Sequence, residues 1–101
     1  MKSDIRRDRD SKKWFGTFEY EPGTDPALKP CPFCGEAQDL YVYGSSSSAS
    51  YFVRCQTCAS EASGFDLPRI KVNRRTRAAF EAAHREGFAQ GIAAWNRRAA
   101  V

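Results

Sequence analysis

The four cysteines of the chain form two pairs, Cys31-Pro32-Phe33-Cys34 and Cys55-Gln56-Thr57-Cys58, and this pattern constrains the fold more than any other feature. Two residues separate the cysteines of each pair, and residues 35–54 lie between the pairs. Such spacing is typical of zinc sites, because two short loops can aim four thiolates at one tetrahedral ion. The sequence therefore predicts one structural Zn²⁺ bound by Cys31, Cys34, Cys55 and Cys58.

Two disulfides are the main alternative to a metal, and the start of the chain argues against them. Residues 1–10 contain no apolar stretch that could act as a signal peptide, and no segment is suited to crossing a membrane. We therefore expect a cytoplasmic protein, and reducing conditions there favour metal over disulfides. Catalytic zinc is disfavoured because four thiolates leave no open position for water. A redox role is weaker still, because no strand–helix–strand pattern surrounds either pair.

The length of 101 residues fits one small domain, preceded by a segment of different composition. Residues 1–13 alternate basic residues with aspartates, and Ile5 is their only large aliphatic residue, which is too little apolar surface to offset the entropy of ordering. We expect a mobile arm over residues 1–27. Its aromatic segment at 14–20 either lies over the domain as an edge strand or binds a partner.

The remaining sequence predicts a hairpin followed by a helix. Residues 39–43 and 51–54 are β-branched and aromatic and predict two strands, with a Ser-rich loop over 44–50 between them. Apolar residues then recur every three or four positions, which predicts a helix from about 76 to 97 with Thr76 as its N-cap. The predicted fold is a small α+β zinc-binding domain over residues 28–98. It is a zinc ribbon, a β-hairpin with two Cys-x-x-Cys knuckles packed against the C-terminal helix.

Three smaller features of the sequence concern the backbone of the cysteine loops, the continuity of the helix and the role of its histidine. Gly35 follows the first knuckle and suits a positive φ, whereas Ala59 at the equivalent place implies either a different geometry or a strained alanine. Gly87 and Gly91 either allow the helix to approach the hairpin closely or break it in two. His84 lies on or near the apolar stripe and is expected to pack rather than to bind metal.

Charge adds a candidate surface. The formal net charge is +4, and four metal-bound thiolates with one Zn²⁺ lower it to about +2. This mild positive charge permits contact with nucleic acid without requiring it. The candidate surface for phosphates or an acidic partner comprises Arg74, Arg75, Arg77, Arg97 and Arg98. The helix dipole equally explains Arg97 and Arg98 at a helix C-terminus, and Trp95 is expected to pack over the knuckles.

Several of these segments resemble one known family. Four segments carry the resemblance: the run Leu28-Lys29-Pro30-Cys31-Pro32-Phe33-Cys34-Gly35, the Tyr/Val-rich hairpin, the second cysteine pair and the run Ala93-Ala94-Trp95-Asn96-Arg97-Arg98. Together they are similar to the Lar-type restriction alleviation family of phages and prophages. The resemblance covers about residues 28–98. It departs at Ala59, where the family usually has glycine, and over residues 60–91, which are longer than in the compact form of the family.

The resemblance implies a zinc-ribbon protein that relieves restriction by a host type I restriction–modification enzyme, whose subunits would be its partners. A mechanism by DNA mimicry is excluded, because it needs a dense acidic surface. Two other functions stay open: a nucleic-acid-binding zinc ribbon in transcription or RNA handling, and a plain protein-interaction module. The sequence contains no recognisable nucleophile–base pair or phosphate-binding glycine loop, so we expect a protein that is not an enzyme.

Overall fold

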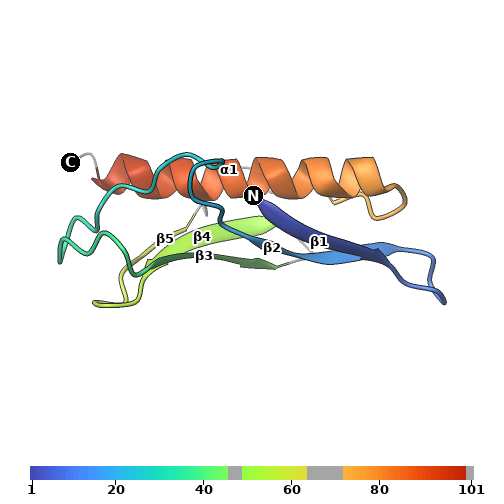
Figure 1. Ribbon diagram of the computed structural model, residues 1–101, viewed down its shortest axis with the longest axis horizontal. Helices are drawn as coiled ribbons and strands as arrows, with labels where there is room; N and C mark the ends of the chain where they lie inside the picture. The colour runs from blue at the N-terminus through green and yellow to red at the C-terminus, as the bar shows by residue number, and fades with distance from the viewer. Residues whose placement is uncertain (46–48, 64–71, 100–101) are drawn as a thin grey trace.

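Two antiparallel sheets and one long helix make up the computed structural model, which describes residues 1–45, 49–63 and 72–99. The elements are β1 (Lys2–Arg7), β2 (Trp14–Glu19), β3 (Leu40–Ser45), β4 (Ser50–Cys55), β5 (Glu61–Ser63) and α1 (Arg77–Ala99). β1 pairs with β2 in one sheet, and β4 lies between β3 and β5 in the other. Both sheets lie on the same side of α1 and follow one another along it (Figure 1). The small α+β class expected from the sequence is confirmed.

The β3–β4 hairpin has one buried and one exposed face, as the two-residue period of a strand requires. Leu40 pairs with Cys55, and Val42 with Val53, on the face that packs toward α1. The aromatic side chains of Tyr41 and Tyr43 lie on the opposite, open face. Because Leu40 and Cys55 pair at the end of the hairpin, the second cysteine loop begins next to the start of β3. Residues 46–48 of the expected flexible loop lie outside the described residues.

The helix α1 begins at its predicted cap and continues through both glycines. The Thr76 hydroxyl accepts a hydrogen bond from the Ala79 amide at 3.2 Å, as an N-cap side chain does. An added Cβ at Gly91 would lie 2.8 Å from the Tyr51 carbonyl oxygen, and one at Gly87 would overlap the carbonyl of Ala49. Of the two alternatives for these glycines, the structure therefore shows close approach of the helix to β4 and no break in the helix.

The first 27 residues, for which the sequence predicts a mobile arm, contain two paired strands in the structure. They begin with a hairpin in which β2 directs alternate residues toward α1, and Phe18 stacks on His84 with 4.1 Å between ring centroids. The apolar residues of β2 thus supply the burial that ordering requires, while the charged residues of β1 stay exposed. Gly16 permits the tight pairing, because an added Cβ would lie 2.6 Å from the Asp4 carbonyl oxygen.

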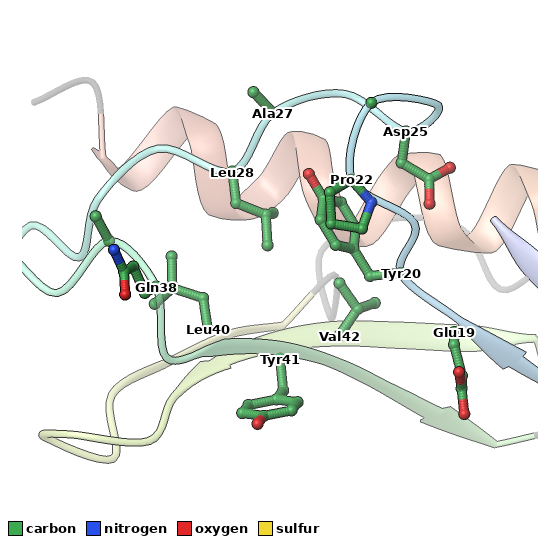
Figure 2. Close-up of a pocket in the computed structure, with 12 residues that line it drawn as sticks. Glu19, Tyr20, Pro22, Asp25, Ala27, Leu28, Gln38, Leu40, Tyr41 and Val42 are labelled. Carbon is green, nitrogen blue, oxygen red and sulfur yellow. The ribbon is translucent and has the colours of Figure 1, made fainter.

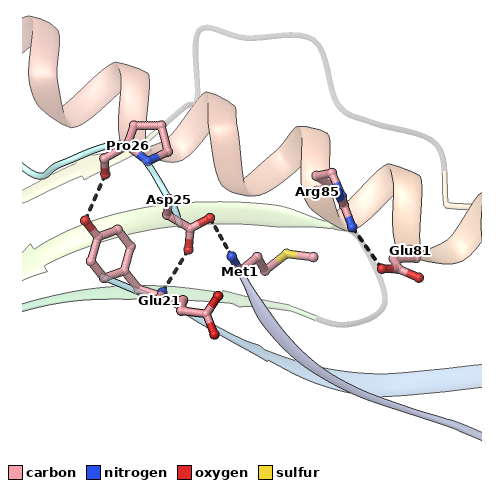
Figure 3. A network of polar contacts seen from close by, with 7 residues as sticks. Met1, Glu21, Asp25, Pro26, Glu81 and Arg85 are labelled. Atoms are coloured by element: carbon pink, nitrogen blue, oxygen red, sulfur yellow. Dashed lines mark hydrogen bonds and ion pairs between the residues drawn. The ribbon is translucent and has the colours of Figure 1, made fainter. Parts of the chain in front are cut away.

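Polar contacts hold the connection between β2 and the first knuckle (Figure 3). The Met1 amino group lies 2.6 Å from one Asp25 carboxylate oxygen, and the Glu21 amide donates to the other at 2.8 Å. The Tyr20 hydroxyl donates to the Pro26 carbonyl at 2.8 Å. This segment is therefore held against the start of the chain.

Candidate metal centre

The first cysteine loop precedes β3 and closes on itself through backbone hydrogen bonds. The Gly35 amide donates to the Cys31 carbonyl at 2.9 Å, and the Cys31 amide donates to the Glu36 carbonyl at 2.8 Å. Gly35 has φ of 78°, in the left-handed region that glycine adopts without strain. This turn confirms the positive φ expected for Gly35 and directs the sulfurs of Cys31 and Cys34 to one side.

The second cysteine loop follows β4 and repeats the same backbone geometry. The Ala59 amide donates to the Cys55 carbonyl at 2.8 Å, and the Cys55 amide donates to the Ser60 carbonyl at 2.9 Å. Ala59 has φ of 62°. The second loop therefore keeps the geometry of the first, with a strained backbone at the alanine. Two loops of equal geometry therefore present Cys31 with Cys34 and Cys55 with Cys58.

The four sulfur atoms gather at one point, as the spacing of the cysteines predicts. All lie within 4.8 Å of one another, with 3.6 Å between Cys31 and Cys58 and 3.5 Å between Cys34 and Cys55. Four sulfurs at about 2.3 Å from a tetrahedral ion are roughly 3.8 Å apart. The cluster is thus compatible with one structural metal ion bound by four thiolates.

Hydrogen bonds prepare part of this cluster for ionisation. Burial raises the pKa of Cys31, but hydrogen bonds from the Ser60 hydroxyl and from the amides of Cys34 and Phe33 outweigh it and lower the pKa to about 6. The Glu36 amide lowers the pKa of Cys34, yet desolvation and the neighbouring cysteines raise it to about 12. Four thiolates this close repel one another, so all four ionise together only with a cation between them.

Two residues that the sequence analysis missed support the cysteine loops. Ser60 Oγ lies 3.3 Å from Cys31 Sγ and 3.1 Å from Cys58 Sγ, so its single proton can be donated to either sulfur. The Thr57 hydroxyl donates to the Glu36 carboxylate at 2.7 Å and links the two loops directly. Their position next to the cysteines was the only sequence signal, because neither residue type marks a metal site by itself.

The end of α1 covers the cluster, as expected for Trp95. The indole of Trp95 is buried with Cys31 and Cys55, and its Nε1 donates to the Lys29 carbonyl at 2.8 Å. Asn96 accepts a hydrogen bond from the Lys29 amide at 3.0 Å and donates one to the Ala27 carbonyl at 3.0 Å. These three hydrogen bonds attach the segment before the first knuckle to the last turns of the helix.

Among the described arginines of the candidate surface, Arg97 lies far from the other three. Arg77 begins α1, and Arg97 lies 20 positions later, which is about 30 Å along a helix. Arg74 lies before the helix, where its Nε donates to the Trp14 carbonyl at 3.0 Å. Arg75, Arg77 and Arg97 are exposed, and the side chain of Arg98 lies outside the described residues. The structure thus brings Arg74, Arg75 and Arg77 together and separates them from Arg97.

His84 is fully buried and lies outside the cysteine cluster, in agreement with its expected packing role. Its Nδ1 is 2.7 Å from the Tyr51 hydroxyl, and Phe18 and Phe80 contact its ring. Burial raises the pKa of Tyr51, so the phenol keeps its proton and can donate it to the imidazole.

A mostly apolar cavity of about 970 Å³ lies between β3 and the segment that follows β2 (Figure 2). Tyr20, Leu28, Leu40 and Val42 are among its lining residues. The Asp25 carboxylate at its rim is already engaged by the Met1 amino group and the Glu21 amide. The lining therefore offers an apolar surface rather than a group of reactive side chains.

Comparisons with known proteins assign no family to this chain. Neither the family models, nor the curated proteins, nor the solved structures include a match to it. The resemblance to restriction alleviation proteins consequently rests on the motifs alone. Within the part of the chain that the structure describes, no helix is both long enough and apolar enough to span a bilayer.

Proposed function

We propose that the four cysteines hold one structural Zn²⁺ in a zinc ribbon, and that the protein modulates type I restriction–modification without being an enzyme. Four thiolates at tetrahedral spacing favour zinc among the common metals. They would also complete the coordination shell, so the ion stabilises the fold and activates no water. The protein then acts by binding the restriction enzyme or its DNA.

One observation carries the proposal: the first and the last of the segments on which the family resemblance rests meet in space. Trp95 and Asn96, from the second run, make three hydrogen bonds to the backbone of Ala27 and Lys29, at and beside the start of the first run. The knuckles and the helix end therefore form one structural unit, as the resemblance implies for this family.

The same contacts indicate where a partner would bind. Trp95 and Asn96 are occupied inside the protein, whereas Arg97 of the same run is exposed. A guanidinium at this position can form paired hydrogen bonds with a carboxylate of a protein partner. Arg97 is therefore the residue of this run that we assign to partner recognition.

Affinity purification from a host with a type I system tests the proposal. The tagged protein should recover the methyltransferase or specificity subunit, and Cys31→Ser, which removes one metal ligand, should recover neither. Arg97→Glu should reduce the recovery several-fold, whereas the matched variant Arg85→Glu, at an exposed site in the middle of α1, should not. Recovery of nucleic acid alone would instead favour the nucleic-acid-binding module. Recovery of neither class would contradict both functions.

A further inference from the structure

Basic side chains gather at the end of the molecule opposite the cysteines. The tip of the β1–β2 hairpin and the residues before α1 both lie at this end, to the right in Figure 1. The Trp14 amide donates to the Arg74 carbonyl at 3.0 Å, and Arg74 Nε donates to the Trp14 carbonyl at 3.0 Å, so the two segments are joined directly. We call this region the basic end; its cations are Arg6, Arg7, Arg9, Lys12, Lys13, Arg74, Arg75 and Arg77.

The carboxylates of this region leave its positive charge largely unneutralised. Among the described residues, the acidic residues of this region are Asp4, Asp8 and Asp10, against eight cations. Asp8 accepts hydrogen bonds from the Ser11 amide at 3.1 Å and from the Ser11 hydroxyl at 2.6 Å, so its carboxylate is used within the turn. Among the described residues, Arg6 forms an ion pair with Asp4 at 3.3 Å, and the other seven cations form none.

The shape of the basic end matches its charge. β1 and β2 form a two-stranded antiparallel ribbon, and the major groove of duplex DNA is wide enough to admit such a ribbon. Arg6 pairs with Phe15 on one face, and Arg7 pairs with Trp14 on the other. The Arg7 and Trp14 face is the one directed toward α1, as the stacking of Phe18 on His84 shows. The ribbon would therefore enter a groove with its Arg6 and Phe15 face, and the cations of its tip, such as Arg9, Lys12 and Lys13, would meet the phosphates beside the groove.

We propose that the basic end binds duplex DNA through its phosphates, with the β1–β2 ribbon in the major groove and the residues before α1 against the adjacent backbone. This inference assigns a DNA contact to a region that the proposed function does not use, and it does not depend on an effect on restriction. The metal cluster has no part in the contact, because it lies at the other end of a molecule 46 Å long. Aromatic residues beside the cations, such as Phe15, would lie along the groove.

The salt dependence of binding tests the proposal. Each phosphate that a cation neutralises contributes about −0.9 to the slope of log K against log salt concentration. Binding of the metal-loaded protein to a short labelled duplex is measured by fluorescence anisotropy between about 50 and about 200 mM salt. We expect Arg75→Gln with Arg77→Gln, and separately Arg9→Gln with Lys13→Gln, to make the slope shallower by about 1.8 each.

The matched control is Lys29→Gln with Arg85→Gln, which removes the same charge from two exposed positions outside the basic end and should leave the slope unchanged. An equal decrease of the slope in all three double variants would overturn the proposal. Absence of salt-dependent binding by the unaltered protein would also overturn it. A shallower slope in the Arg75 and Arg77 variant alone would overturn it as well, because the ribbon would then not contact DNA. Equal affinity for single-stranded DNA or for polyglutamate would also overturn it. None of these outcomes depends on recovery of restriction subunits, so the two proposals fail separately.

Discussion

Ala59 occupies the same left-handed backbone conformation in the second cysteine loop that Gly35 occupies in the first, with φ of 62° and 78°. This conformation costs a residue with a Cβ about 1–2 kcal/mol. The greater freedom of glycine in the unfolded chain offsets roughly 0.5–1 kcal/mol of that difference. We predict that Ala59→Gly raises the free energy of unfolding of the metal-loaded protein by about 0.5–1 kcal/mol, measured by urea denaturation.

The reverse change in the first loop is the control for this prediction. A Cβ at Gly35 would meet no atom within 4 Å, so Gly35→Ala adds backbone strain and no clash. It should lower the free energy of unfolding by about 1 kcal/mol. If Ala59→Gly destabilised the protein as well, the two loops would not share the backbone geometry described above.

Single residues also show where sequence reasoning reaches its limit. The positive φ of Gly35 could be predicted because glycine after a short metal-binding loop has a local cause. The neighbours of His84 could not. Tyr51 and Phe18 contact its ring from sequence positions far away, and Phe18 belongs to a segment expected to be part of a mobile arm.

At the scale of elements, helix α1 contains two glycines whose role is steric. Helix propensity alone predicts that Gly87→Ala stabilises the protein by about 1 kcal/mol. The added Cβ, however, would overlap the carbonyl of Ala49, and overpacking of this kind costs about 1–3 kcal/mol. We predict no net gain and a loss of up to about 2 kcal/mol in the free energy of unfolding, measured by thermal or urea denaturation.

Ala82→Gly on the exposed face of α1 is the comparison. Propensity predicts a loss of about 1 kcal/mol there, with no steric contribution. Destabilisation by both changes therefore identifies close packing at Gly87. Stabilisation by Gly87→Ala would show that α1 does not approach β4 as closely as the structure has it.

The elements that could be predicted were those with a strong local pattern. The apolar repeat and Thr76 place the helix within two residues of its observed end at Ala99, and the β-branched runs locate β3 and β4. β1 contains one large aliphatic residue, Ile5, so its pairing with β2 has no apolar alternation to reveal it. β5 has three residues, too few for any periodicity.

At the scale of the whole molecule, the two ends were predictable to different degrees. The gathering of the four cysteines follows from spacing within two short loops, so the sequence alone could predict that these four side chains meet. The basic end depends on contact between Trp14 and Arg74, 60 positions apart in the chain. No local pattern contains that contact, which explains why Arg74 was grouped with Arg97 instead.

The molecule also carries one tryptophan near each end, which makes metal removal measurable at the end with the cysteines. Trp14 begins β2 at the basic end, and Trp95 is 1 % exposed in the core that contains Cys31 and Cys55. In a Trp14→Phe variant, fluorescence reports the environment of Trp95 alone. A structural zinc contributes on the order of 10 kcal/mol, comparable to the whole stability of a small domain.

We predict that chelation of the metal in this variant shifts the emission of Trp95 to longer wavelength, because the core around it unfolds and the indole becomes hydrated. Metal release is followed in parallel with a colorimetric indicator, and the shift should follow it in proportion. Acid should act in the same direction, since protonated thiols do not bind the ion. Metal release with no change in emission would contradict a structural role. The hydrogen bond from Trp95 to Lys29 and the packing of Leu40 and Val53 would then be sufficient to hold the two loops together.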